Sequence, residues 1–201
     1  MLNVLILLLA VVLVAAGTVV LWAIGTYNAL AAARDACRNA FAQIDASLRR
    51  RHDLIAAWVE AVAGHVEHER ETLDAVTAAH TTAVAGLVAV RANVRDVQAM
   101  AQLGLAESQL GGTLGRLLGV ADACPGLGGE TNLSRFREDL TATAHAVSIA
   151  QQAFNESVQR YNRLREAFPG SLIAAGFDFA AMANLEISRS DDHQPATALL
   201  S

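Results

Sequence analysis

Two histidines and a glutamate have the spacing in this chain that is most suited to binding a metal ion. His65 and His68 are three residues apart, so both rings could reach one metal from one face of a helix, and Glu69 lies four residues after His65. The chain has neither the His-Glu-x-x-His zinc motif nor the Glu-x-x-His pair of di-iron bundles. A solvated, salt-bridged turn of helix is therefore the preferred interpretation, and we expect no metal or other cofactor.

The patterns that accompany enzyme catalysis are missing from the sequence. The glycines within residues 124–129 do not follow a predicted strand and lack the lysine of a phosphate-binding loop. No serine lies in a nucleophile-elbow pattern. His145 is interpreted as a packed bundle residue, Cys37 lies on an apolar helical face, and Cys124 has no identifiable partner base. We therefore expect a protein that is not an enzyme.

An aromatic residue followed by an asparagine occurs three times in the chain, as Tyr27-Asn28, Phe154-Asn155 and Tyr161-Asn162. The last two pairs are seven residues apart, which places each ring on the apolar stripe of a helix and each asparagine at the edge of that stripe. Asparagine is unfavourable inside helices. We therefore expect its amide to hydrogen-bond to a neighbouring helix and fix the register of a bundle, with chance repetition as the alternative.

An apolar run from Leu2 to Ile24 precedes the first charged side chain, which is Arg34. About 20 apolar helical residues cross a bilayer core, so this run is long enough to span a membrane. Trp22 and Tyr27 lie at its C-terminal end, where aromatic rings favour the membrane interface. The alternatives are a buried core helix and a cleaved signal peptide, for which the run is too long and its start lacks a basic residue.

Charge predicts the orientation of this anchor and argues against one class of partner. Five arginines, Arg34, Arg38 and Arg49 to Arg51, follow the span and none precedes it, which places the C-terminal domain in the cytoplasm and the N-terminus outside. We therefore expect a single-pass protein of the cell membrane, meaning the inner or plasma membrane. The formal net charge is −5 and the chain has no long basic block, so we do not expect nucleic-acid binding.

Long blocks without proline predict an all-α protein. The first block runs from the anchor to about Ala89 as a continuous helix, with a bend near Gly64 or Gly86 as an option. Further long helices are expected over about residues 91–121 and, after an Asn132 N-cap, about residues 133–168, where apolar residues recur every seven positions.

The predicted architecture has three parts. They are a transmembrane anchor over residues 1–26, an antiparallel helical bundle over residues 27–187 and a disordered tail over residues 188–201. The bundle is continuous with the anchor and has three long helices plus a short C-terminal helix over about residues 177–187. Gly111, Gly115 and Gly119 are four residues apart, and they either let a neighbouring helix approach closely or only weaken their own helix.

Short polar motifs follow one another in a specific order along most of the chain. They are Tyr27-Asn28 after the apolar run, Ala40-Phe41-x-Gln43-Ile44-Asp45, Leu48-Arg49-Arg50-Arg51-His52-Asp53-Leu54-Ile55, Gly64 before His68-Glu69, Ala106-Glu107 before Leu110, and Phe154-Asn155-x5-Tyr161-Asn162 leading to Phe168-Pro169. In this combination the chain resembles a LemA family protein. It departs from the family at Ala56-Ala57, where a proline is usual, at Cys124, where an aromatic residue is usual, and at Phe154, where tyrosine is commoner.

The resemblance implies an N-terminally anchored, antiparallel α-helical bundle. The family has no established catalytic activity, and some of its members take part in bacterial membrane organisation, including magnetosome membrane formation. No catalytic residue is carried over. Gln43, Asp45, Arg51 and Asp53 correspond to motif positions only, and we expect them to make structural polar contacts in the bundle.

These observations favour a membrane-anchored scaffold or adaptor, or a self-assembling component in membrane organisation. Its expected partners are the membrane and other membrane proteins or further copies of the chain. A metal-binding factor that uses His65, His68 and Glu69 is one alternative. A sensor that relays a signal through the continuous first helix is the other.

Overall fold

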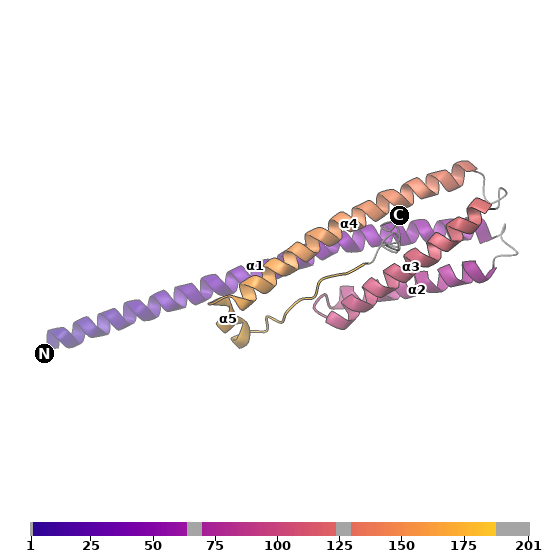
Figure 1. Ribbon diagram of the computed structural model, residues 1–201. Coiled ribbons are helices and arrows are strands. Elements are labelled where there is room, and N and C mark those ends of the chain that lie inside the picture. The colour runs from indigo at the N-terminus through magenta and orange to yellow at the C-terminus, as the bar shows by residue number, and fades with distance from the viewer. Residues whose placement is uncertain (1, 64–69, 124–129, 188–201) are drawn as a thin grey trace, which may run out of the picture.

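The computed structural model describes residues 2–63, 70–123 and 130–187, and within these ranges the chain contains helices and no strand (Figure 1). The helices are α1 (Leu2–Ala63), α2 (Arg70–Ala92), α3 (Val97–Ala123), α4 (Glu130–Glu166) and α5 (Gly170–Gly176). The predicted all-α fold is confirmed, and so is an N-terminal apolar helix that continues without a break into a bundle.

The bundle is built from two antiparallel pairs of helices. α1 packs along α4, and α2 packs along α3 (Figure 1). The second pair lies beside the C-terminal part of α1, which contacts α2. The N-terminal part of α1 extends beyond the other helices as a single rod, so the molecule is long and narrow at that end (Figure 1).

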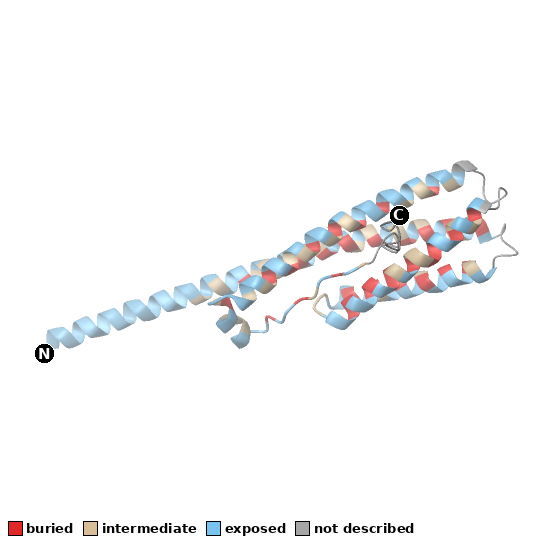
Figure 2. Cartoon of the chain, in the orientation of Figure 1, coloured by how far each residue is buried: buried red, intermediate tan, exposed pale blue. Residues whose placement is uncertain are grey.

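Burial along α1 begins where the other elements cover it. None of residues 2–29 is buried; Leu30 is the first buried residue, and from Cys37 to Val62 a residue is buried at every third or fourth position (Figure 2). These buried residues of α1 form part of the core, with the rings of Phe41 and Phe154 5.8 Å apart and Trp58 stacked on Phe136 at 4.5 Å. Tyr27 precedes them on α1 and stays exposed, at 39%.

The first predicted block contains two helices, so the prediction of one helix reaching Ala89 is wrong. α1 ends at Ala63 and α2 begins at Arg70, and the segment between them, with the predicted bend at Gly64, lies outside the described residues. The bundle therefore has four long helices in place of three. Folding α2 back lets its own apolar stripe, which includes Leu73, Val76 and Ala83, pack into the same core as α3.

Two helix starts also differ from the prediction, and hydrogen bonding explains the first. α3 starts at Val97 because the Asp96 carboxylate accepts a hydrogen bond from the Ala99 N–H at 3.0 Å, which caps the first turn. α4 starts at Glu130, so Asn132 lies inside the helix and is not its N-cap.

The predicted short helix over residues 177–187 is wrong as well. α5 lies earlier, and Phe177 adopts an extended conformation that ends it. Residues 179–187, which we call the C-terminal strap, have no regular secondary structure and run back along the bundle between α4 and α3 (Figure 1). The tail predicted to be disordered, residues 188–201, lies outside the described residues.

Gly104 is the glycine of α3 that the strap requires. A Cβ atom at Gly104 would lie 2.1 Å from the carbonyl oxygen of Glu186, so only glycine lets the strap backbone pass this close to the helix. By contrast, a Cβ at Gly115 or Gly119 would meet nothing within 4 Å, and one at Gly111 would meet only the Arg51 guanidinium at 3.6 Å. The stripe of glycines four residues apart therefore makes no close helix contact.

Replacing Gly104 by alanine should loosen the strap. We expect Gly104→Ala to lower the free energy of unfolding by about 1–3 kcal/mol, because the new methyl group overlaps backbone that cannot rotate away. Gly115→Ala is the matched control and should be neutral or stabilising by up to about 1 kcal/mol, since alanine favours helix. Denaturant unfolding of the full chain in detergent measures both changes, and equal effects of the two substitutions would contradict this role of Gly104.

Candidate functional site

Two asparagines of α4 hold the C-terminal strap by its backbone. The Asn155 amide donates to the Leu185 carbonyl at 3.0 Å, and its oxygen accepts from the Leu185 N–H at 2.9 Å. The Asn162 amide makes the same pair of bonds with the backbone of Met182, at 2.8 and 3.2 Å. Each side-chain amide thus satisfies one N–H and one C=O that an extended segment beside a helix would otherwise leave unpaired.

The spacing of these contacts follows from the rise of the two chain conformations. Seven helical residues rise about 10.5 Å, and three extended residues span about 9–10 Å. Asn155 and Asn162 are seven residues apart on α4, and their partners Leu185 and Met182 are three residues apart on the strap. The seven-residue repeat of the aromatic–asparagine pair therefore sets which strap residues lie beside which turns of α4.

The aromatic members of these two pairs lie in the core, as the stripe requires. Phe154 and Tyr161 are fully buried, and the Tyr161 hydroxyl donates to the Ala180 carbonyl at 2.7 Å. Arg165 and Gln151 also donate to strap carbonyls, at Phe179 and Leu185, each at 2.9 Å. The partner expected for the asparagines was a neighbouring helix, and the partner found is the strap.

The third pair, Tyr27-Asn28, is used differently. Tyr27 packs edge-on against the rings of Phe177 and Phe179, with centroids 5.2 and 5.4 Å away. Asn28 is exposed, and none of the hydrogen bonds found among the described residues involves it. This pair therefore joins α1 to the beginning of the strap through its ring alone.

The polar motif positions of α1 divide into exposed and bridging residues. Gln43 and Asp53 are exposed on the surface of the helix. Asp45 accepts hydrogen bonds from Arg49 one turn away and forms an ion pair with Arg91 of α2 at 3.5 Å. Arg51 points into the bundle, so Asp45 and Arg51 connect α1 to other helices.

A buried ionic cluster joins three helices near the middle of the bundle. The Glu107 carboxylate of α3 is completely buried and contacts His52 Nε2 at 2.6 Å and Arg51 Nη1 at 3.3 Å, both on α1. His80 of α2 contacts the His52 carbonyl oxygen through its Nε2 at 3.1 Å, and the two imidazole rings are 5.4 Å apart. Burying a carboxylate costs several kcal/mol unless it is paired, and here two partners compensate that cost.

Sequence reasoning did not predict this cluster as a unit. Arg51 was expected to make a polar contact, and Glu107 was recognised only as part of a motif. The available signal was the position of Glu107, because it shares a helical face with Leu103, Leu110 and Leu114, which are buried. A carboxylate at a core position needs a cationic or donor partner, but the sequence does not say which helix supplies it.

The predicted metal candidates His65, His68 and Glu69 lie outside the described residues. Among the described residues, no group of three or more histidine, cysteine, aspartate or glutamate side chains could hold a metal ion. Burial raises the pKa of the Cys37 thiol, which keeps this group protonated and makes it a poor nucleophile. Burial also raises the pKa of Tyr161, whose neutral hydroxyl then serves as a hydrogen-bond donor.

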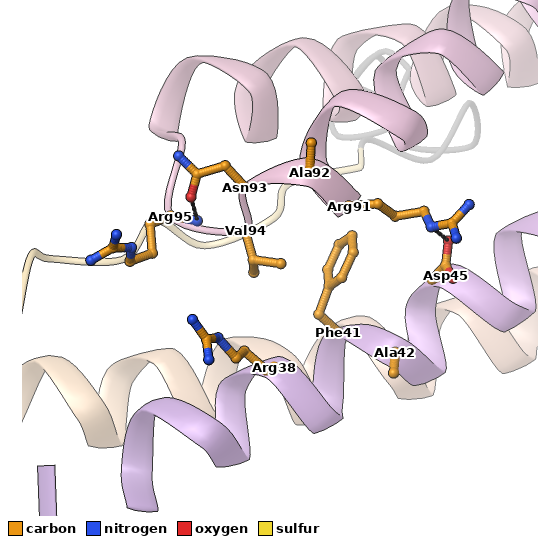
Figure 3. A pocket seen from close by; sticks show the side chains of 9 residues that line it. All are labelled: Arg38, Phe41, Ala42, Asp45, Arg91, Ala92, Asn93, Val94 and Arg95. Atoms are coloured by element: carbon orange, nitrogen blue, oxygen red, sulfur yellow. Dashed lines mark hydrogen bonds and ion pairs between the residues drawn. The ribbon is translucent and has the colours of Figure 1, made fainter. Parts of the chain in front are cut away.

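The surface has a groove of about 720 Å³ between α1 and the turn that joins α2 to α3 (Figure 3). Arg38 and Phe41 extend from α1 toward this turn, which carries Arg95 (Figure 3). Arg95 forms an ion pair with Asp178 at 2.9 Å, and its hydrogen bond holds the pKa of that carboxyl below its usual range. Arg91 lies at the other end beside Asp45.

A second groove, of about 470 Å³, lies between α3 and α4 and opens onto the buried cluster. Glu107 and Arg51 form its inner wall, Gly111 and Gly115 leave space on α3, and the exposed His145 lies on α4. The Arg51 Nε is buried and has no hydrogen-bond partner among the described residues. The first groove presents guanidinium groups to the surface and is suited to contacting carboxylates, whereas the only guanidinium among the described residues lining the second groove, that of Arg51, is largely buried against Glu107.

The fold and these sites define a class of protein, a helical bundle that begins with an apolar helix and is held in register by buried and half-buried polar side chains. The LemA family profile matches residues 40–198, which is most of the chain. The chain belongs to the LemA family, as its motifs predicted, and this family is not known as an enzyme family. A search of curated proteins found no match.

Removing an asparagine clamp should free the strap from α4. In Asn155→Ala or Asn162→Ala we expect amide hydrogen exchange at Leu185 or Met182 to become much faster and stability to fall by about 1–3 kcal/mol. Gln159→Ala, on the exposed face of the same helix, is the control and should change neither quantity. Unchanged exchange at both strap amides in the asparagine variants would show that the clamp does not hold the strap.

The buried carboxylate should be more important for stability than any exposed ion pair. Glu107→Ala leaves Arg51 and His52 buried without a partner, so we expect a loss of about 3–5 kcal/mol in the free energy of unfolding. Asp122→Ala, which breaks the exposed pair with Arg137, is the control, and its expected loss is within about 1 kcal/mol. Similar losses in the two variants, measured by denaturant unfolding, would contradict this assignment.

Proposed function

We propose that this protein is a membrane-anchored scaffold or adaptor in which α1 crosses the membrane once and carries the bundle on the cytoplasmic side. One observation supports this most strongly, namely that the most apolar window of α1 is entirely unburied by the rest of the chain. Exposing a large apolar side chain to water costs about 1.5–3 kcal/mol, and this segment has more than a dozen of them. A lipid environment removes that cost.

A second helix, α2, also has the length and composition to cross a membrane, but its setting differs. A third of its most apolar window is buried, and it packs along α3 in the bundle core. The C-terminal turn of α2 carries Arg91, which is paired with Asp45 of α1. These contacts favour α2 as a core helix of the bundle, so the proposal keeps a single span.

The continuity of α1 supports a scaffold in particular. A helix of 62 residues is about 93 Å long, and the part after Ile24 extends about 58 Å from the proposed membrane. Such a rigid helix would hold each surface of the bundle at a fixed distance from the membrane. The same continuity would serve a signal relay, which is the second candidate, whereas the candidate ligands of the metal-dependent factor lie outside the described residues.

The groove of Figure 3 is the surface that we assign to a partner, either another membrane protein or a second copy of the chain. Its guanidinium groups are held by ion pairs at the surface, and such pairs contribute only about 0–1 kcal/mol. Arg91 and Arg95 can therefore exchange their present carboxylates for those of a partner at little cost. The proposal predicts a partner segment that carries acidic residues.

Photo-crosslinking in native membranes tests this function. We expect a photoreactive amino acid at Ala42, inside the groove, to give a discrete larger species, and the same group at Ala56 to give much less of it. Both positions are exposed alanines of α1, so the comparison isolates the groove. A chain that fractionates with membranes but stays monomeric from both positions, with no co-purifying protein, would contradict a scaffold role.

A further inference from the structure

A second apolar surface lies beside the exposed part of α1. Residues 167–177, which we call the α5 elbow, comprise the turn after α4, helix α5 and Phe177, and they contain no charged residue. Phe168, Leu172 and Phe177 within it are 73%, 63% and 54% exposed. Three large apolar side chains so open to solvent in eleven residues indicate a surface that is covered in the working protein.

The elbow is packed at the point where the apolar run of α1 ends. The rings of Phe168 and Trp22 are 5.5 Å apart, and Phe177 meets Tyr27 at 5.2 Å. A Cβ at Gly170 would lie 1.9 Å from the Leu164 carbonyl oxygen, so α5 turns back tightly against the end of α4. The chain thus holds these side chains next to one short stretch of α1.

The geometry points to a second membrane contact: we propose that the α5 elbow inserts Phe168, Leu172 and Phe177 into the interfacial layer of the membrane that α1 crosses. This inference rests on the proposed single span by α1. If Leu2–Ile24 fills the hydrocarbon core, Trp22 lies at its boundary and Phe168 lies at the same level.

Two further observations favour lipid over a protein partner. The exposed side chains of the elbow continue the exposed apolar surface of α1 without an intervening charge, since Trp22 touches Phe168 directly. The charged residues that border the elbow all lie outside it: Arg163, Arg165 and Glu166 precede it, with Arg165 and Glu166 paired at 3.7 Å, and Asp178 follows it, paired with Arg95. An apolar surface with charged side chains only at its border matches the interface of a bilayer, where arginines can reach lipid phosphates.

Such a contact would fix the orientation of the bundle. A domain attached to the membrane through a single helix can rotate about the axis of that helix and tilt together with it. A second contact on one side of α1 stops that rotation, so the groove of Figure 3 keeps one direction relative to the membrane. The scaffold would then present its partner surface at a set height and in a set direction.

Depth-dependent fluorescence quenching tests this inference. The full chain, with Cys37→Ala and Cys124→Ser, is labelled at one introduced cysteine with an environment-sensitive dye and reconstituted in phosphatidylcholine–phosphatidylglycerol vesicles. The test position is Leu172→Cys, and the control is Leu105→Cys, which is 73% exposed on α3 and far from the span. We expect blue-shifted emission and several-fold stronger quenching by spin-labelled lipid at position 172 than at position 105.

A third position separates failure of this inference from failure of the anchor. Leu13→Cys lies in the middle of the proposed span and should be quenched by lipid labelled deep in the acyl chain. Quenching at 13 but equal, weak quenching at 172 and 105 would overturn the elbow contact and leave the anchor in place. Absence of quenching at 13 would overturn both.

Discussion

α1 pairs with α4 along its C-terminal part, where its buried residues begin at Leu30, and the other elements are arranged around that pair. The same unbroken helix therefore passes from a segment with no buried residue to a segment in which, from Cys37 to Val62, every third or fourth residue is buried. Its first part needs an apolar solvent and its second part needs a partner helix. In the proposed function, membrane attachment and bundle assembly are thus linked through one rigid element, which is the physical basis for the structural role that we propose.

Buried and half-buried polar side chains give this apolar bundle its register. Leucine, valine and alanine stripes tolerate small displacements along the helix axis, whereas a hydrogen-bonded amide or carboxylate does not. Asn155 and Asn162 fix the strap on α4, and Glu107 fixes α3 on α1. The grooves at the surface are bounded by these fixed segments, so their shapes depend on the same interactions.

The sequence predicted the helices whose apolar repeats extend over many turns, including α4 and the continuous α1, because such repeats specify one packed face. It did not predict the strap. The buried residues Phe179, Met182 and Leu185 are three positions apart. This spacing fits one face of a helix, but it fits equally well one face of an extended chain with three residues per turn, so the pattern does not distinguish the two conformations. It identified the asparagines as hydrogen-bonding groups at the edge of the apolar stripe but not their partner, and it missed the Glu107 cluster. In both cases the partner lies on an element far away in the chain, which local patterns do not reveal.

The central claim is that one uninterrupted helix both crosses the membrane and begins the bundle. This claim can be tested by placing a spin label at successive positions from Leu5 to Asp45 in full-length protein in bilayers. Collision with oxygen measures the exposure of each label to lipid, and collision with a water-soluble nickel complex measures its exposure to water. The account predicts a helical period throughout, lipid exposure on all sides up to Ile24, and one protected side from Leu30 onward. A loss of the helical period between Ile24 and Arg34, or access of the nickel complex along Leu5 to Val20, would contradict it.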